Sequence, residues 1–169
     1  NKWKKNKNEW LNSLDIEKVM SQYERKYKNF EFLGPSPIDF DKKKFNNNCV
    51  WNDLCNFDLN EKIIKNKTKI GIIFNTDPHY MGGSHWISMF IDINKKFILF
   101  FDSTGDDMPN EIKKLINKIR KQGNAIGIKF KIYINKKEHQ KKNTECGMYS
   151  LHTIIALLDG HHNVEFFLN

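Results

Sequence analysis

Residues 85–102 read HWISMFIDINKKFILFFD, and this stretch decides the fold. Two apolar runs, 86–93 and 97–102, flank a polar Asn-Lys-Lys turn, which is the pattern of a β-hairpin. In an antiparallel pair the start of the first strand lies beside the end of the second strand. We therefore expect His85 and Asp102 to be neighbours in space.

The pattern on either side of the hairpin predicts an α+β fold with a central mixed or antiparallel sheet flanked by helices. The expected elements are a helix capped by Ser13, a strand over 69–74, the hairpin, a helix over 109–123, a strand over 126–134 and a helix over 146–158. Between residues 34 and 60 there is no sustained periodicity, which favours a long loop with short helical pieces.

Length and composition favour one folded domain over residues 1–169. Hydrophobic residues make up 39% of the chain and aromatic residues 13%, which excludes a disordered chain. The chain opens without Met, so we expect a piece of a longer protein. No uncharged apolar stretch approaches the roughly 20 residues that a membrane helix needs.

The cysteines and the charged residues indicate which compartment, metals and binding partners to expect. Three cysteines, an odd number in a chain of this length, favour free thiols and a reducing compartment, either cytoplasm or nucleus. Cys49 and Cys55, with His79 nearby, lack the spacing of a zinc site, and we expect no metal. Residues 110–145 hold 11 Lys and Arg against three Asp and Glu, so they form either a solvated face or a nucleic-acid contact.

A cysteine at the start of a predicted helix could react together with His85 and Asp102. Cys146 opens the last apolar helix, where free N–H groups and the helix dipole favour a thiolate. With His85 as base and Asp102 as its orienting carboxylate, Cys146 would complete a Cys-His-Asp nucleophile. The amide of Gln140 could join the Cys146 N–H as an oxyanion donor. The alternatives are a core cysteine, a surface histidine and an ordinary loop glutamine.

The same residues resemble a known family. The strings Gly83-Ser84-His85-Trp86, Phe101-Asp102-Ser103 and Gln140 followed by Glu145-Cys146-Gly147-Met148-Tyr149 resemble signatures of the SUMO-protease and adenovirus-protease superfamily. Glu9-Trp10-Leu11-Asn12 resembles the opening motif of that superfamily. Within it, the chain is most similar to polyprotein-processing proteases of large DNA viruses.

The resemblance implies a papain-like core in altered chain order and cleavage after Gly-Gly. We expect no cofactor. Trp10, Trp86 and Gly147 would then line a channel too narrow for residues that carry a Cβ. The substrate would be a viral polyprotein, in host cytoplasm or virion, or alternatively a ubiquitin-like modifier. A basic binding module with a vestigial triad is the non-enzymatic alternative. Residues 34–60 resemble no modifier-binding surface, which favours short linear substrates.

Overall fold

The computed structural model describes residues 11–81, 85–142 and 145–169. These residues form a mixed six-stranded sheet in the order β1-β3-β4-β5-β6, with β2 also paired to β3. The strands are β1 (Phe30–Phe32), β2 (Ser36–Pro37), β3 (Lys69–Asn75), β4 (Trp86–Asp92), β5 (Phe97–Phe101) and β6 (Lys131–Ile134). Strands β3, β4 and β5 pair antiparallel, whereas β1, β2 and β6 run parallel to the strands they join.

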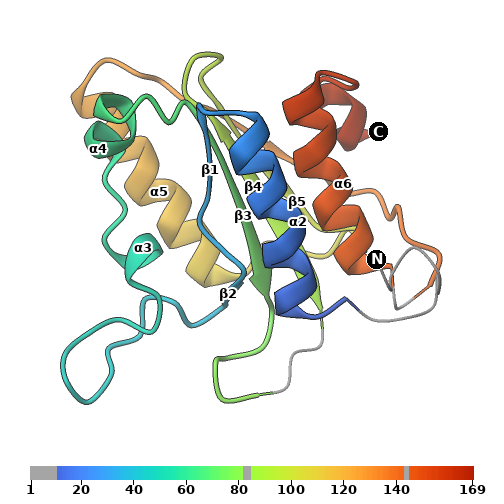
Figure 1. Cartoon of the computed structure of the whole chain (residues 1–169), viewed down its shortest axis with the longest axis horizontal. Helices are drawn as coiled ribbons and strands as arrows, with labels where there is room; N and C mark the ends of the chain where they lie inside the picture. The colour runs from blue at the N-terminus through green and yellow to red at the C-terminus, as the bar shows by residue number, and fades with distance from the viewer. Residues whose placement is uncertain (1–10, 82–84, 143–144) are drawn as a thin grey trace.

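Helices cover both faces of this sheet. They are α2 (Ser13–Lys26), α3 (Asn52–Cys55), α4 (Leu59–Ile64), α5 (Asn110–Ala125), α6 (Cys146–Asp159) and the 3-10 helix η1 (Val164–Leu168). Figure 1 shows α2 and α6 on one side of the sheet and α3, α4 and α5 on the other. In the described part of the chain, no helix has the length and apolar character needed to cross a membrane.

The two helical layers explain why the central strands read as continuous apolar runs. In β4, Ile87, Met89 and Ile91 pack into the core on the α5 side. Trp86 and Phe90 of the same strand pack into the core on the α2 and α6 side. Because successive side chains of a strand point to opposite faces, burial of both faces makes all seven β4 residues buried. The sheet is therefore the middle layer of an α+β sandwich.

The hairpin predicted from residues 85–102 is confirmed. Strands β4 and β5 pair antiparallel with Ser88 opposite Phe101. This register sets His85, which precedes β4, beside Asp102, which follows β5.

Two predicted boundaries are wrong. Asn12, not Ser13, caps α2, because the Asn12 side chain accepts from the Asp15 N–H at 2.9 Å and Asp15 accepts from the Asn12 N–H at 3.2 Å. The strand predicted over 126–134 is confined to β6, because the chain first turns at Gly127, where φ is +78°. The three-residue β1, held by parallel pairing to β3, was not predicted.

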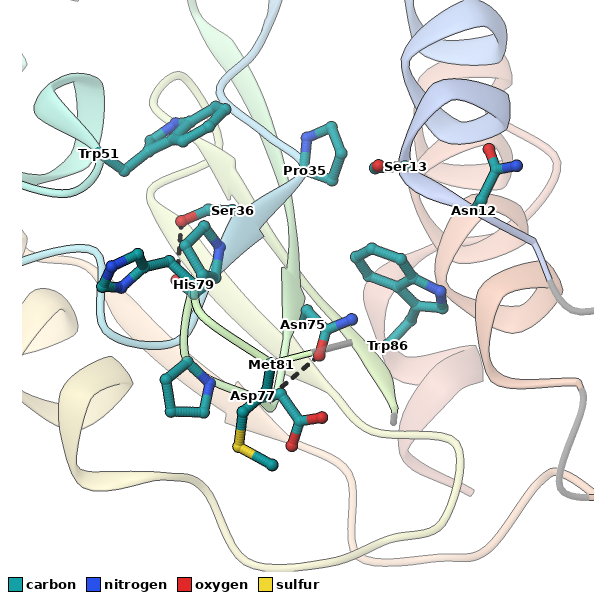
Figure 2. A pocket seen from close by; sticks show the side chains of 12 residues that line it. Asn12, Ser13, Pro35, Ser36, Trp51, Asn75, Asp77, His79, Met81 and Trp86 are labelled. Carbon is teal, nitrogen blue, oxygen red and sulfur yellow. Dashed lines mark hydrogen bonds between the residues drawn. The ribbon is translucent and has the colours of Figure 1, made fainter. Parts of the chain in front are cut away.

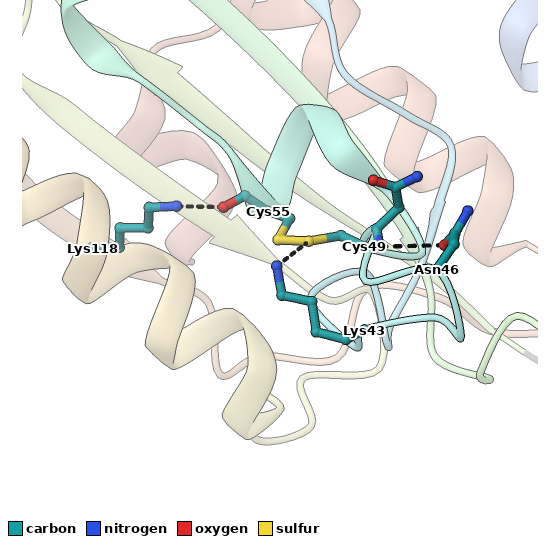
Figure 3. The surroundings of a disulfide bond; sticks show 6 residues. Lys43, Asn46, Cys49, Cys55 and Lys118 are labelled. Carbon is teal, nitrogen blue, oxygen red and sulfur yellow. Dashed lines mark hydrogen bonds between the residues drawn. A yellow bond between two sulfur atoms is a disulfide. The ribbon is translucent and has the colours of Figure 1, made fainter.

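The segment between residues 34 and 60 contains the expected short helical pieces, α3 and the first residues of α4, together with the strand β2. It also corrects the prediction of three free thiols, because a disulfide joins Cys49 and Cys55 (Figure 3). An isolated bridge pairs Lys43 with Cys49, and α3 then returns the chain so that the two cysteine Cα atoms lie 6.2 Å apart. That separation lies within the usual range for a disulfide. Cys146 is the free cysteine.

Candidate active site

His85 and Asp102 meet where β4 begins and β5 ends. Nε2 of His85 lies 2.7 Å from Oδ1 of Asp102. The His85 side chain is 19% exposed and that of Asp102 is 5% exposed. The pair is thus largely shielded from water, yet the imidazole keeps an open edge.

Cys146 adds a sulfur atom to this pair. It is the first residue of α6, and its Sγ accepts a hydrogen bond from the backbone N–H of Trp86 at 3.4 Å. Cys146 is also one of the groups that raise the pKa of His85, the residue before Trp86. Because Nε2 of His85 is engaged with Asp102, Nδ1 is the ring nitrogen that remains for the sulfur. Carboxylate, imidazole and sulfur are therefore gathered at one end of β4.

The surroundings of His85 favour its protonated form. Burial by itself lowers the pKa of His85, but the hydrogen bonds to Asp102 and Cys146 outweigh burial and raise the pKa from 6.5 to about 10. The negative charge of Asp102 acts in the same direction as these hydrogen bonds. At neutral pH His85 is therefore an imidazolium.

Asp102 is held as a carboxylate by more than His85. Burial raises the pKa of Asp102, yet hydrogen bonds from His85 and Thr104 together bring it below the usual 3.8. The backbone N–H and the hydroxyl of Thr104 both donate to Oδ1 of Asp102, at 3.0 and 2.7 Å. The turn after β5 thus holds the Asp102 carboxylate in place through two hydrogen bonds from Thr104.

Asn135 fixes the backbone of Asp102. Oδ1 of Asn135 accepts from the Asp102 N–H at 2.8 Å, and its Nδ2 donates to the Asp102 carbonyl at 2.6 Å. Asn135 directly follows β6 and is 1% exposed. Neither Asn135 nor Thr104 was predicted from the sequence. A signal existed for Thr104, since an Asp side chain in a turn commonly accepts from the backbone N–H two residues further on.

Gln140 is tied to the same corner through Ser103. The Ser103 hydroxyl donates to Oε1 of Gln140. The Ser103 carbonyl accepts from the N–H groups of His139 and Gln140 at 2.7 and 3.1 Å. Because the carbonyl end of the Gln140 side chain is taken by Ser103, its amide hydrogens are the group that can donate to a substrate.

Trp86 and Gly147 lie at the start of α6. The Trp86 indole N–H donates to the Leu11 carbonyl at 2.9 Å. A Cβ on Gly147 would come within 3.1 Å of the Leu11 Cβ and 3.3 Å of the Trp86 Cδ1. Gly147 is buried, and its missing side chain lets α6 approach Trp86 closely. Trp10, the other predicted channel residue, lies outside the described residues.

Other candidate groups are placed elsewhere. The His139 ring packs on the Phe101 ring, with 5.2 Å between the ring centroids. Nε2 of His139 is buried without a hydrogen-bond partner in the described structure. His79 pairs with Asp39 at 2.6 Å. Within residues 11–81, 85–142 and 145–169, no cluster of three or more His, Cys, Asp and Glu could hold a metal ion.

The sequence has relatives among viral proteases. A protein of Acanthamoeba polyphaga mimivirus that bears the name thiol protease R355 is 37% identical over 157 residues, 90% of this chain and 49% of that protein. SUMO-1 cysteine protease S273R of African swine fever virus is 28% identical over 160 residues, 88% of this chain and 58% of that protein. The chain thus spans about half the length of these curated relatives.

Solved structures share the fold. The crystal structure of the African swine fever virus pS273R protease matches with a TM-score of 0.79 at 23% identity, over 96% of this chain and 62% of that one. A structure of the SUMO protease Ulp1 matches with a TM-score of 0.63 at 16% identity, over 95% of this chain and 73% of that one. These matches confirm the predicted α+β fold.

A family match covers most of the chain. Residues 1–120 match the family described as Vaccinia virus I7 processing peptidase. The matched part contains His85 and Asp102 and ends before Gln140 and Cys146. Since the match extends over well more than half of the 169 residues, this chain belongs to the family of the Vaccinia virus I7 processing peptidase.

Proposed function

We propose that this chain is the catalytic domain of a cysteine endopeptidase of a large DNA virus. The observation that carries the proposal is the meeting of Asp102, His85 and Cys146. His85 lies 2.7 Å from Asp102, and the Cys146 sulfur at the start of α6 accepts from the N–H of Trp86, the residue after His85. The names of the viral relatives support a thiol protease. In this proposal Cys146 is the nucleophile, His85 the general acid and base, and Asp102 the residue that orients the imidazole.

Acylation follows from the charges at the site. The Cys146 sulfur attacks the carbonyl carbon of the scissile peptide, forming a C–S bond. His85, which is protonated at neutral pH, gives its proton to the leaving amine as the C–N bond breaks. Asp102 keeps the imidazole oriented throughout, because its carboxylate is fixed by Thr104 and its backbone by Asn135.

Deacylation uses the same groups in reverse. The neutral His85 takes a proton from a water molecule, whose oxygen attacks the thioester, and the Cys146 sulfur leaves with the C–S bond electrons. In both steps the backbone N–H of Cys146 and the amide of Gln140 would hold the oxyanion. Ser103 supports this role of Gln140, since it engages the carbonyl end of that side chain.

The proposed substrate is a flexible polypeptide that is cut after Gly-Gly. Tight packing of Gly147 against Trp86 supports a confined approach to Cys146. Trp10 would form the opposite wall of the channel, so side chains at the two positions before the cut would be excluded. Structural polyproteins of the virus fit this requirement, and cleavage would take place in the host cytoplasm or the virion.

A ubiquitin-like modifier is the second candidate substrate. The observation that favours it is the name of the African swine fever virus relative, a SUMO-1 cysteine protease. A modifier protease grips a folded domain over a broad surface, whereas a polyprotein protease needs only the extended peptide. The two candidates therefore differ in how much activity depends on substrate beyond the peptide.

The test compares a hydrophobic-x-Gly-Gly-x peptide with SUMO, NEDD8 and ubiquitin fusions. We expect cleavage after the second Gly, at rates on the peptide equal to or above those on the fusions. Replacing that Gly by Ala in the peptide, or Cys146→Ala in the protein, should abolish cleavage.

Two results would contradict the proposal in different ways. A fusion cut a thousandfold faster than its own C-terminal peptide would establish the modifier protease, because that ratio, roughly 4 kcal/mol, requires remote binding energy. Failure to cleave any Gly-Gly substrate would contradict the peptidase proposal and favour the non-enzymatic alternative, a basic binding module.

A further inference from the structure

A hairpin formed by residues 42–50 projects from the segment 34–60. Figure 1 shows it as the blue-green loop at the lower left, away from the sheet. An antiparallel bridge between Lys43 and Cys49 joins its two arms, and backbone hydrogen bonds of 2.6 to 3.0 Å support the turn. Asn47 closes the turn in the left-handed conformation, with φ at +67°. The hairpin therefore has a defined shape of its own.

The base of the hairpin is braced to the rest of the protein. The Cys49–Cys55 disulfide ties it to α3, and Figure 3 shows Lys118 of α5 donating to the Cys55 carbonyl at 2.5 Å. The Trp51 N–H also donates to the Phe40 carbonyl at 3.0 Å. Because the base is held at these points, a side chain at the tip stays away from the body of the protein.

The tip combines an exposed aromatic ring with positive charge. Phe45 lies in the turn, and its exposed fraction is 109%, so the described chain covers almost none of it. Lys42 and Lys44 are exposed, and within the described part of the chain their ammonium groups make no hydrogen bond or ion pair. Residues 42–50 contain no Asp or Glu. Single exposed apolar residues are common, but an aromatic ring held at a braced tip among lysines fits a specific kind of partner.

A second loop reaches the same end of the molecule. Figure 1 shows the light-green loop after β3 extending beyond the end of the sheet, as the hairpin does. His79 of this loop joins the two, since its N–H and Nδ1 lie 2.8 and 2.6 Å from the carboxylate oxygens of Asp39. Tyr80, the next residue, is 70% exposed. Two aromatic side chains are thus presented to solvent on loops that are bonded to each other.

These tips are separate from the pocket near the candidate active site. Figure 2 shows that pocket, of about 380 Å³, with Trp51 and Trp86 on its wall. Among the described residues, Phe45 and Tyr80 do not line it. A pocket receives a group from a ligand, whereas these aromatic rings stand on projecting loops. Their partner must therefore accept an inserted group.

An anionic membrane surface fits both the rings and the lysines. Aromatic side chains are favoured at the depth of the lipid headgroups, and lysines are attracted to anionic lipids. A bilayer also admits a projecting side chain without a preformed cavity. Single-stranded nucleic acid offers phosphates and stacking bases, but proteins hold it in positively charged grooves rather than on tips. The shape of this surface therefore favours the membrane.

We infer that the chain docks on an anionic membrane surface through the hairpin and Tyr80, with Phe45 inserted among the headgroups and Lys42 and Lys44 beside anionic lipids. The inference goes beyond the proposed function, since docking needs no catalysis. Strand β4 begins at the end of the sheet from which both loops project. The candidate active site would therefore act on polypeptides close to the membrane.

Vesicle co-sedimentation tests the inference. The chain is mixed at about 50 mM salt with vesicles of pure phosphatidylcholine or with vesicles that also contain about 30% phosphatidylserine. We expect a partition coefficient about tenfold or more higher on the anionic vesicles. Phe45→Ser should lower this coefficient by about fivefold or more, and Lys42→Gln combined with Lys44→Gln by about tenfold or more. Phe45→Trp should bind as well as the wild type, because an indole ring also favours the headgroup region.

Matched control variants lie at the opposite end of the sheet. Ile64→Ala, at the end of α4, shortens an apolar side chain that is 84% exposed. Lys121→Gln combined with Lys129→Gln removes two exposed lysines near the end of α5 and the start of β6. Neither control should change the partition coefficient by more than about twofold, because charges far from the membrane are screened by salt. Thermal melts of all variants confirm that they fold.

The outcomes are distinct. Equal binding to both kinds of vesicle, binding of Phe45→Ser at the wild-type level, or an equal loss in the control variants would each overturn the inference. Binding of a single-stranded oligonucleotide that depends on Phe45, while vesicle binding does not, would assign the tip to nucleic acid instead. We expect Phe45→Ser to cleave the Gly-Gly peptide in solution like the wild type. Failure of the peptidase proposal would therefore leave the vesicle result standing, and the reverse also holds.

Discussion

At the residue scale, Asp102 combines two tasks that belong to different atoms. Its carboxylate accepts from His85 and Thr104, while its backbone is locked by Asn135. Substituting the side chain therefore changes the carboxylate contacts while the strand end stays in place. This separation makes Asp102 a clean position for a test of chemistry.

We predict that Asp102→Asn lowers kcat/KM for a Gly-Gly peptide by about two orders of magnitude or more. An amide of the same shape no longer stabilises the imidazolium and permits the wrong tautomer. Steady-state cleavage assays measure the effect, and Asp107→Asn, an exposed residue of the same loop, is the control. Unchanged kcat/KM in Asp102→Asn would mean that another group orients His85.

The pKa of His85 predicts a pH dependence of stability. Because its pKa is raised from 6.5 to about 10, protonated His85 stabilises the folded state fully below about pH 6.5. This contribution is lost as the pH rises through about 10. We therefore expect the free energy of unfolding of the wild type, relative to His85→Gln, to decrease between pH 6 and pH 10. Urea unfolding of both proteins measures it, and a relative stability that increases over this range would contradict the assignment.

The sequence indicated His85 and Asp102 because hairpin geometry relates two strand ends by a simple rule. Asn135 could not be found in this way. It bonds the Asp102 backbone from the end of a different strand, and such a side-chain to backbone contact leaves no spacing in the sequence.

At the element scale, the geometry of the candidate site depends on how closely α6 approaches β4. Glu145, the N-cap residue, makes no side-chain hydrogen bond to the helix and instead accepts from the N–H groups of Lys141 and Lys142. The first turn of α6 is thus positioned by packing at Gly147 rather than by a side-chain cap.

We predict that Gly147→Ala lowers kcat/KM by about tenfold or more, because its Cβ would lie 3.1 Å from Leu11 and 3.3 Å from Trp86. The helix start and Cys146 would have to shift by a few tenths of an ångström. Met148→Ala, the next residue of α6 and 40% exposed, is the control. Peptide assays and thermal melts distinguish loss of activity from loss of fold. Full activity in Gly147→Ala would show that the close approach of α6 to Trp86 is dispensable.

Elements with long periodic runs could be predicted from the sequence, whereas short ones could not. The central strands and α6 bury enough side chains to show their pattern locally. Strand β1 has three residues and owes its structure to parallel pairing with β3. The disulfide likewise depends on the bridge that returns the chain from Lys43 to Cys49, which no periodicity shows.

At the scale of the whole molecule, α5 and Cys146 lie on opposite sides of the sheet. Helix α5, which carries much of the positive charge of residues 110–145, covers one face, and α6 covers the other. The exposed basic residues of α5 include Lys113, Lys114 and Lys121. A nucleic acid held there would leave access to the candidate active site open.

We predict that any nucleic-acid binding occurs through residues 110–145 and weakens with salt, because phosphate contacts release counterions. Fluorescence anisotropy with duplex DNA between 50 and 200 mM salt measures this. The triple substitution Lys113→Gln, Lys114→Gln and Lys121→Gln should flatten the salt dependence, while Lys18→Gln on α2 should not. Binding that is independent of salt, or undetectable at 50 mM salt, would leave these lysines as a solvated face.

The central claim is that Cys146 is the nucleophile that attacks the carbonyl carbon of the second Gly of the Gly-Gly pair. The most direct measurement treats the native chain with a short peptide that ends in a Gly-Gly vinyl methyl ester and locates the adduct by mass spectrometry. We predict one adduct, on Cys146, which forms much more slowly in Asp102→Asn because the imidazolium beside the sulfur is weakened. An adduct on Cys49 or Cys55, or an unmodified chain under conditions where the Gly-Gly peptide is cleaved, would contradict it.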